Sequence, residues 1–164
     1  MITSQKGKAF IESFEQCILH PYLDGKKIAT IGVGNTWYPN GKKVTMKDPP
    51  ITKEFADQMF GTILAIFEKD VNFLLQNHVV TQNQFDALVS FAYNVGPDID
   101  ADTIAEGLGD STLLKKVLAN PNDPTIFAEF MKWVSKGTVN EKGLTARRSA
   151  EATIYSKGIY VNHK

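Results

Sequence analysis

The segment from Ile51 to Leu75 most constrains the fold of this chain, because its apolar residues recur every three or four positions. That spacing places them on one face of a single long amphipathic helix. At about 1.5 Å per residue such a helix spans roughly 35 Å, long enough to connect a small lobe with a larger one. We expect a cleft between the two lobes to lie beside this helix.

The rest of the sequence predicts further helices and one hairpin near the N-terminus. Ser4 can cap a first helix, which we expect Pro21 to end. A short strand up to Asp24, a turn at residues 25–27 and a return strand at residues 28–33 then form the hairpin. Capping residues and apolar periodicity predict later helices at residues 82–94, 112–119, 124–134 and 145–155, with loop and a short helix at residues 98–110.

These elements indicate the α+β class, mainly helical, in a single domain over residues 1–164. We expect an N-terminal lobe of about residues 14–60 and a C-terminal helical lobe of about residues 75–164 that also includes the first helix. Hydrophobic residues make up 43% of the chain and charged residues 22%, which is typical of an ordinary globular protein. A chain of 164 residues can bury roughly 70% of its extended surface without disulfides or metals.

Charge and cysteine content limit the partners and the compartment. Lys plus Arg and Asp plus Glu both number 18, so no overall charge draws the chain to nucleic acid. The N-terminus lacks the apolar stretch of a secretory signal, and no run is long enough to insert into a membrane, so we expect a cytoplasmic protein. Cys17 is the one cysteine, which fits a reducing compartment. The scattered His20, His78 and His163 indicate no metal, and no sequence motif indicates a cofactor.

The segment from Phe14 to Thr36 carries the residues suited to chemistry. Glu15 is expected in the last turn of the first helix, where apolar neighbours and the negative end of the helix dipole favour a retained proton. A three-residue loop would pair Asp24 with Ile28 and place Thr30 on the same face. A proton donor with a carboxylate and a hydroxyl suits hydrolysis of a glycosidic bond. Taken singly, Glu15 also fits an exposed helical face, Asp24 a turn, and Thr30 an ordinary strand position.

The same segment resembles the start of the phage-type lysozymes, the endolysins of glycoside hydrolase family 24. The likeness rests on Glu15, on Tyr22-Leu23-Asp24 and on Thr30-Ile31-Gly32-Val33-Gly34. It continues at residues 84–96 and 111–115 and in the C-terminal pattern that contains Arg147-Arg148 and Glu151. The resemblance implies a two-lobed lysozyme-like fold and cleavage of peptidoglycan between N-acetylmuramic acid and N-acetylglucosamine. It implies Glu15 as the general acid, with Asp24 and Thr30 acting on water or on the oxocarbenium ion.

Other residues take their expected roles from this resemblance. Tyr93 and Asn94, at the end of the central helix, are expected to contact the substrate, as are Thr36 and Thr112. Tyr93 also fits a half-buried aromatic position, and Asn94 a C-terminal cap. The two arginines and Glu151 are spaced for ion pairs within a helix and are interpreted as structural.

Two positions depart from the family pattern. Gln16 stands where the family commonly has Gly, and Asn35 stands where it commonly has His. Both changes affect the surroundings of the expected site without removing Glu15, Asp24 or Thr30. Gly32 and Gly34 within a strand indicate either a substrate close to the backbone or a bulge.

The resemblance also implies how such a protein reaches its substrate. We expect a monomer that stays in the host cytoplasm before lysis, binds the peptidoglycan glycan strand and gains access to the wall through a holin. Two rival hypotheses remain open: a wall-binding protein that kept the fold without the chemistry, and a lytic transglycosylase that releases anhydro-sugars.

Overall fold

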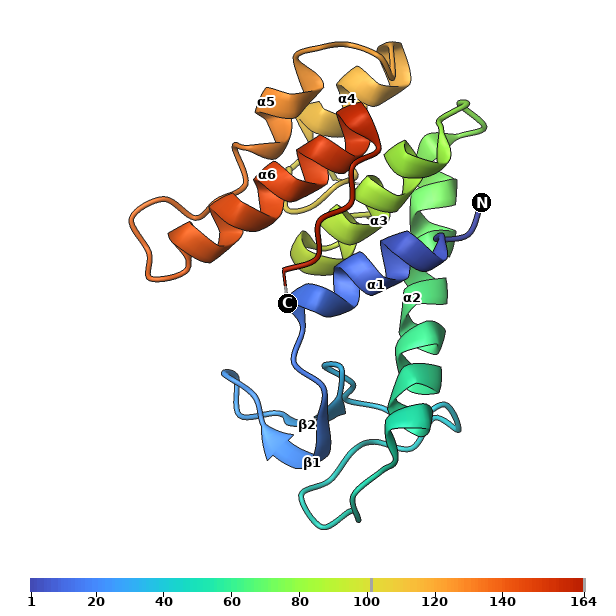
Figure 1. Ribbon diagram of the computed structural model, residues 1–164, viewed down its shortest axis with the longest axis vertical. Coiled ribbons are helices and arrows are strands. Elements are labelled where there is room, and N and C mark those ends of the chain that lie inside the picture. The colour runs from blue at the N-terminus through green and yellow to red at the C-terminus, as the bar shows by residue number, and fades with distance from the viewer. Residues whose placement is uncertain (101, 164) are drawn as a thin grey trace.

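The structure, a computed structural model, describes residues 1–100 and 102–163. Its longest helix is α2, Lys53–Leu75, and the prediction of one long helix here is confirmed. The Thr52 hydroxyl caps its start by accepting a hydrogen bond from the Phe55 N–H at 3.1 Å. Figure 1 shows α2 reaching from the β-hairpin to the helices at the other end of the molecule. Within the described ranges, no helix is both long and apolar enough to cross a membrane.

The architecture is a small antiparallel sheet joined by α2 to a group of packed helices, which confirms the predicted mainly helical α+β class. We call the segment of residues 18–50, which holds the sheet, the small lobe. In chain order the elements are α1 Gln5–Phe14, β1 Ile18–Leu23, β2 Ala29–Gly32, α2 Lys53–Leu75, α3 Gln82–Val95, α4 Thr112–Ala119, α5 Ile126–Phe130 and α6 Glu141–Lys157.

The first helix is shorter than its sequence predicts. It ends at Phe14, and Pro21 lies inside β1 instead of ending the helix. Proline is tolerated there because the strand pairing is irregular between Ile18 and Tyr22, so no regular ladder bond is required of it. The chain therefore turns into extended structure at Glu15, with φ −103° and ψ 149°.

The second strand also ends early, at Gly32 instead of Val33. Gly32 and Gly34 both adopt positive φ, 66° and 78°, which glycine reaches without the steric cost of a Cβ. Between them the chain reverses, and Ile31 and Asn35 exchange two backbone hydrogen bonds of 2.9 Å. The paired glycines thus have a local reason in this reversal.

Local capping signals identify the later helices with differing success. The capping box predicted at Thr81 and Gln84 is present at the start of α3, and Ser111 caps α4 over the predicted residues. The helix predicted at residues 124–134 is only the five-residue α5, whereas α6 begins four residues before the expected start at Thr145. The short helix expected at residues 98–110 is absent from the described part of that segment, and residue 101 lies outside the described residues.

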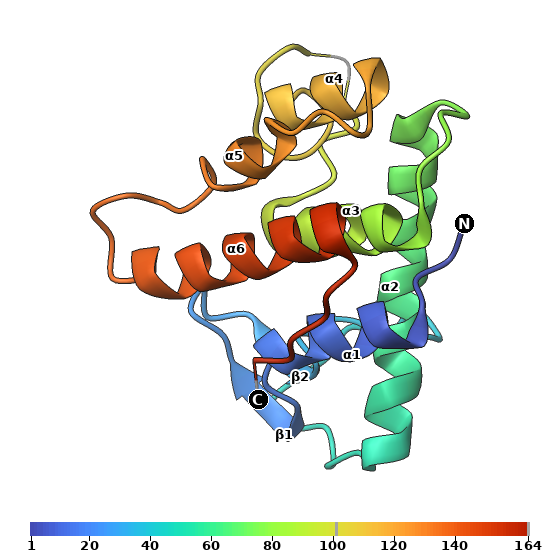
Figure 2. The same ribbon diagram turned by 45° about the horizontal axis from the view of Figure 1, so that its top comes forward.

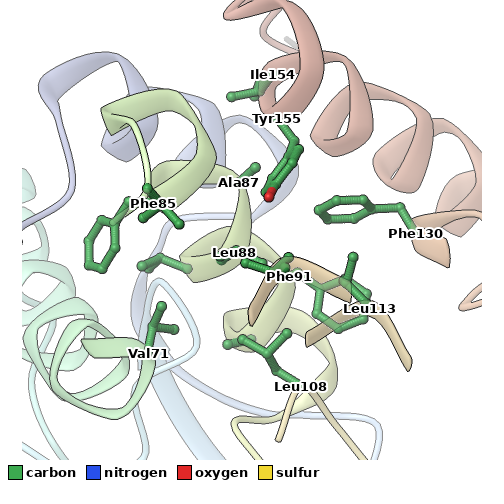
Figure 3. Packing of buried hydrophobic residues seen from close by; sticks show 14 of the residues in the cluster. Val71, Phe85, Ala87, Leu88, Phe91, Leu108, Leu113, Phe130, Ile154 and Tyr155 are labelled. Atoms are coloured by element: carbon green, nitrogen blue, oxygen red, sulfur yellow. The ribbon is translucent and has the colours of Figure 1, made fainter. Parts of the chain in front are cut away.

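The main core surrounds α3, whose residues from Gln84 to Ala92 are all buried. Figure 3 shows Phe91 and Leu88 of α3 packed among side chains from α4, α5 and α6. A second, smaller cluster of Ile31, Val44 and Met59 lies between the small lobe and α2. Burial of each large apolar side chain contributes roughly 2 kcal/mol, so these two clusters fix the hairpin and the helices relative to α2.

Candidate active site

Glu15 occupies the position directly after α1 and is its C-cap. Its backbone N–H donates to the Glu12 carbonyl at 3.0 Å, while its side chain remains 27% exposed. The carboxylate oxygen Oε1 lies 2.8 Å from Nη1 of Arg147 on α6. The apolar surroundings expected from the sequence are therefore only part of the environment, because a guanidinium faces the carboxylate.

Arg147 belongs to a buried set of charges on α6. Its Nε lies 3.2 Å from Oε1 of Glu151, which confirms the ion pair predicted at this spacing. Glu151 also accepts a 2.7 Å hydrogen bond from the Ser90 hydroxyl, and Nε of Arg148 lies 2.9 Å from its other oxygen. Burial raises the pKa of Glu151, and the two guanidinium groups counteract that rise.

The hairpin holds Asp24 as the sequence predicts. Its N–H donates to the Ile28 carbonyl at 3.0 Å, and its Oδ1 accepts hydrogen bonds from the N–H groups of Lys26 and Ile28, both at 2.8 Å. Thr30 pairs across the strands with Tyr22, which places it diagonally from Asp24 on the same face. Thr30 is 2% exposed, and its hydroxyl donates to the Ile28 carbonyl at 2.9 Å.

Tyr22 lies close enough to both Glu15 and Asp24 for each carboxylate to affect its pKa. Burial raises the pKa of its phenol, and the negative charges of Asp24 and Glu15 raise it further. Tyr22 therefore lies within the electrostatic reach of both. From the sequence, Tyr22 was recognised only as part of a motif, although its position two residues before Asp24 already predicts that both side chains lie on one face of the hairpin.

Tyr93 joins α3 to the small lobe. Its hydroxyl donates to the Val33 carbonyl at 3.1 Å, and its ring packs against Phe60 and Phe67 of α2 with centroid distances of 5.8 and 5.1 Å. Burial raises the pKa of Tyr93, and the nearby charge of Glu15 raises it further. Tyr93 thus lies within electrostatic reach of Glu15, and it occupies the half-buried aromatic position that was one of its two interpretations.

The other expected contact residues lie in different surroundings. Asn94 is exposed, its Oδ1 accepts a 2.7 Å hydrogen bond from Nη2 of Arg148, and it lines a pocket of about 450 Å³ together with Arg147. Thr112 is the exposed first residue of α4 and lines a separate pocket of about 340 Å³. Thr36 is half-buried, and its carbonyl accepts from the Val44 N–H at 2.9 Å.

The two departures from the family pattern differ in burial. Gln16 is exposed where the chain leaves Glu15, whereas Asn35 is 2% exposed and lies against α2, with its Nδ2 donating to the Met59 carbonyl at 3.4 Å.

A separate group of carboxylates lies on the loop after α3. Carboxylate oxygens of Asp98, Asp100 and Asp110 lie within 4.8 Å of one another, and carboxylate oxygens are ligands that hard cations such as Ca²⁺ accept.

The chain is similar to known proteins over most of its length. A family model described as phage lysozyme matches residues 12–151. The chain is 36% identical over 160 residues to an endolysin of Bacillus phage PZA, a match that covers 96% of this chain and 56% of that protein. It is 34% identical over 164 residues to an endolysin of Acyrthosiphon pisum secondary endosymbiont phage 1, covering 94% of this chain and 98% of that one.

A solved structure shows the same fold. The endolysin from Escherichia coli O157:H7 phage FAHEc1 superimposes with a TM-score of 0.82 at 36% identity, covering 98% of this chain and 97% of that one. The chain thus spans nearly the full length of two of these relatives and about half the length of the Bacillus phage protein.

Proposed function

This chain belongs to the phage lysozyme family, and from that membership we propose that it is an endolysin with muramidase activity. Its substrate is bacterial peptidoglycan, cut at the β-1,4 bond between N-acetylmuramic acid and N-acetylglucosamine. The observation that carries the proposal is the family match over residues 12–151, a range that contains Glu15, Asp24 and Thr30.

In the proposed mechanism Glu15 donates its proton to the glycosidic oxygen as the bond breaks. Asp24 and Thr30 act on the attacking water or stabilise the oxocarbenium ion. The hydrogen bonds from two backbone N–H groups to Oδ1 of Asp24 support this role, because they fix the carboxylate on the turn. The influence of both Glu15 and Asp24 on Tyr22 supports their action on one bound sugar.

Further residues are proposed to hold the glycan strand. The side-chain oxygen Oδ1 of Asn94 accepts from Arg148, so this amide would serve the substrate as a donor, from Nδ2 to an acetamido oxygen. Tyr93, which lies within electrostatic reach of Glu15, is proposed to offer its aromatic ring to a sugar, and Thr36 and Thr112 are proposed to offer hydroxyls. Each role is additional to the structural contacts that these residues already make.

The route to the wall follows from the same proposal. The enzyme is a monomer that needs no cofactor, binds no nucleic acid and does not insert into the membrane. It remains in the host cytoplasm until a holin opens the membrane, and it then acts on the wall. Lysis of the host cell is the outcome.

Lysis of permeabilised Gram-negative cells tests the proposed muramidase activity. Purified protein should clear their turbidity, and mass spectrometry should find released muropeptides whose new reducing ends have gained one water. Anhydro-sugar ends would instead identify a lytic transglycosylase, since that reaction incorporates no water. Pelleting with the wall but releasing no fragments would identify an inactive wall-binding protein.

The substitution Glu15→Gln tests the assigned acid. It should abolish clearing and change the melting temperature by little, because the partly exposed ion pair with Arg147 contributes on the order of 1 kcal/mol or less. Glu54→Gln, in the exposed first turn of α2, is the matched control and should retain activity. A folded Glu15→Gln protein that clears cells normally would exclude Glu15 as the acid.

A further inference from the structure

We propose that Arg147 is the positioning residue for the catalytic acid and that it holds the Glu15 carboxylate in its working orientation from α6. The inference rests on the proposed function of Glu15 and assigns to Arg147 a role beyond the helical ion pair. Arg147 acts through Glu15 and is not itself assigned a contact with the reacting atoms.

Glu15 lies at the end of a helix, and Arg147 approaches it from a distant part of the chain. The residue lies just past the last turn of α1 in extended conformation, where the regular helix no longer fixes its direction. Arg147, 132 residues later in the chain, approaches it from α6 with Nη1 at 2.8 Å from Oε1. The same guanidinium lies over the ring of Phe14, 5.1 Å from its centroid, so it contacts two consecutive residues at this helix end.

Arg147 can hold Glu15 because it is itself fixed. Its side chain is only 5% exposed, against 27% for Glu15. On the side away from the acid, its Nε pairs with Oε1 of Glu151, which is fully buried and also bound by Ser90. A guanidinium offers donors in a rigid planar fork, so one side chain can contact both carboxylates at once. A lysine ammonium at this position has no second arm of this kind.

The two carboxylates that Arg147 contacts differ in exposure. Glu151 is buried together with Arg147, whereas the Glu15 carboxylate is accessible to solvent. Among the described residues, Arg147 from α6 contacts the Glu15 carboxylate directly, and Tyr22 from β1 and Tyr93 from α3 lie within its electrostatic reach. The 2.8 Å contact from Nη1 of Arg147 therefore fixes where Oε1 of the acid points.

Two substitutions at Arg147 separate positioning from plain stability. Arg147→Met removes the charge and the fork and leaves Arg148 paired with Glu151, whereas Arg147→Lys keeps the charge without the fork. Tyr155→Phe on the same helix is the control, because it removes a 2.9 Å hydrogen bond to the Pro121 carbonyl without touching Glu15. Values of kcat and KM are measured on uncross-linked peptidoglycan strands, with Glu15→Gln assayed in parallel.

We expect kcat of Arg147→Met to fall by at least about tenfold with little change in KM, because a misdirected acid slows chemistry more than binding. Arg147→Lys keeps the charge and should recover part of kcat. Tyr155→Phe should lose stability but keep kcat and KM.

The outcomes distinguish the inference from the function on which it rests. A folded Arg147→Met protein with unchanged kcat would overturn the positioning role, while an inactive Glu15→Gln would still support the function. An active Glu15→Gln protein would overturn the function itself. If Arg147→Met does not fold, Arg147→Lys decides, because normal kcat in that variant would show that the fork is not needed.

Discussion

The Tyr160 hydroxyl donates a 2.7 Å hydrogen bond to Oδ2 of Asp86, which fastens the segment after α6 to α3. Asp86 is 1% exposed and also accepts from the Ser4 N–H at 3.0 Å and from Nε2 of Gln82 at 2.8 Å. Figures 1 and 2 both show this C-terminal segment running down beside α1. One carboxylate therefore joins the beginning and the end of the chain to the central helix, close to the helix that leads into Glu15.

Loss of this hydrogen bond should weaken the whole helical lobe. Tyr160→Phe removes the donor and is expected to lower the free energy of unfolding by about 1 kcal/mol, measured by urea denaturation. Tyr38→Phe is the matched control, because it removes a 3.0 Å bond to Asp48 in a loop of the small lobe. An unchanged unfolding midpoint for Tyr160→Phe would show that the segment is not fastened in solution.

Alkaline solution should destabilise the fold through its buried phenols. Burial raises the pKa of Tyr93, Tyr155 and Tyr160 above the ordinary value of 10.0. Above about pH 10 the unfolded chain releases these protons while the folded chain keeps them, so stability is full below this pH and falls as pH rises. Each group contributes up to about 1.4 kcal/mol per pH unit. Urea unfolding between about pH 8 and about pH 11 measures the slope, which Tyr160→Phe should reduce.

Signals confined to neighbouring residues predicted much of the fold. Thr81 and Ser111 accept hydrogen bonds from N–H groups three residues ahead, so their helices begin where the sequence indicates. The pairing of Asp24 with Ile28 was likewise predictable, because a short turn sets the register of its hairpin. The early end of α1 was not, since Pro21 could end a helix or lie at an irregular point of a strand.

The site was less predictable where it depends on distant residues. Arg147 was recognised only as the partner of Glu151 one helical turn away, because that pairing follows from spacing alone. Its second contact, with Glu15, exists because α1 and α6 pack near each other around α3, and no local pattern encodes that approach. Tyr93 similarly meets Val33 through the packing of α3 against α2 and the small lobe.

Gly34 offers a test of whether the glycan strand passes over the small lobe. Its φ is 78°, and a Cβ added there would meet no atom of the described residues within 4 Å. Gly34→Ala should therefore cost about 1 kcal/mol of stability for the positive φ, and its exposed methyl should raise KM about tenfold. Gly32→Ala is the comparison, because its Cβ would lie 3.2 Å from Oδ1 of buried Asn35. That variant should lose more stability, and equal KM values for both would contradict a substrate at Gly34.

Thr30 is the member of the proposed catalytic set with the strongest structural alternative. It is 2% exposed, and its hydroxyl already donates to the Ile28 carbonyl, so it could serve only to fix the hairpin. Thr30→Val keeps the shape and removes the hydroxyl, and Thr30→Ser keeps the hydroxyl. If the hydroxyl acts on water, kcat should fall about a hundredfold in Thr30→Val and remain near normal in Thr30→Ser.

Stability separates these roles for Thr30. The hydroxyl contributes about 1 kcal/mol through its bond to Ile28, so Thr30→Val should unfold at slightly lower urea than the parent protein. A purely structural hydroxyl would reduce activity only in proportion to the unfolded fraction, which at that loss stays far too small to affect the rate. A hundredfold loss of kcat in a folded Thr30→Val protein therefore requires the hydroxyl to act on the reaction, whereas normal kcat would assign Thr30 to the hairpin alone.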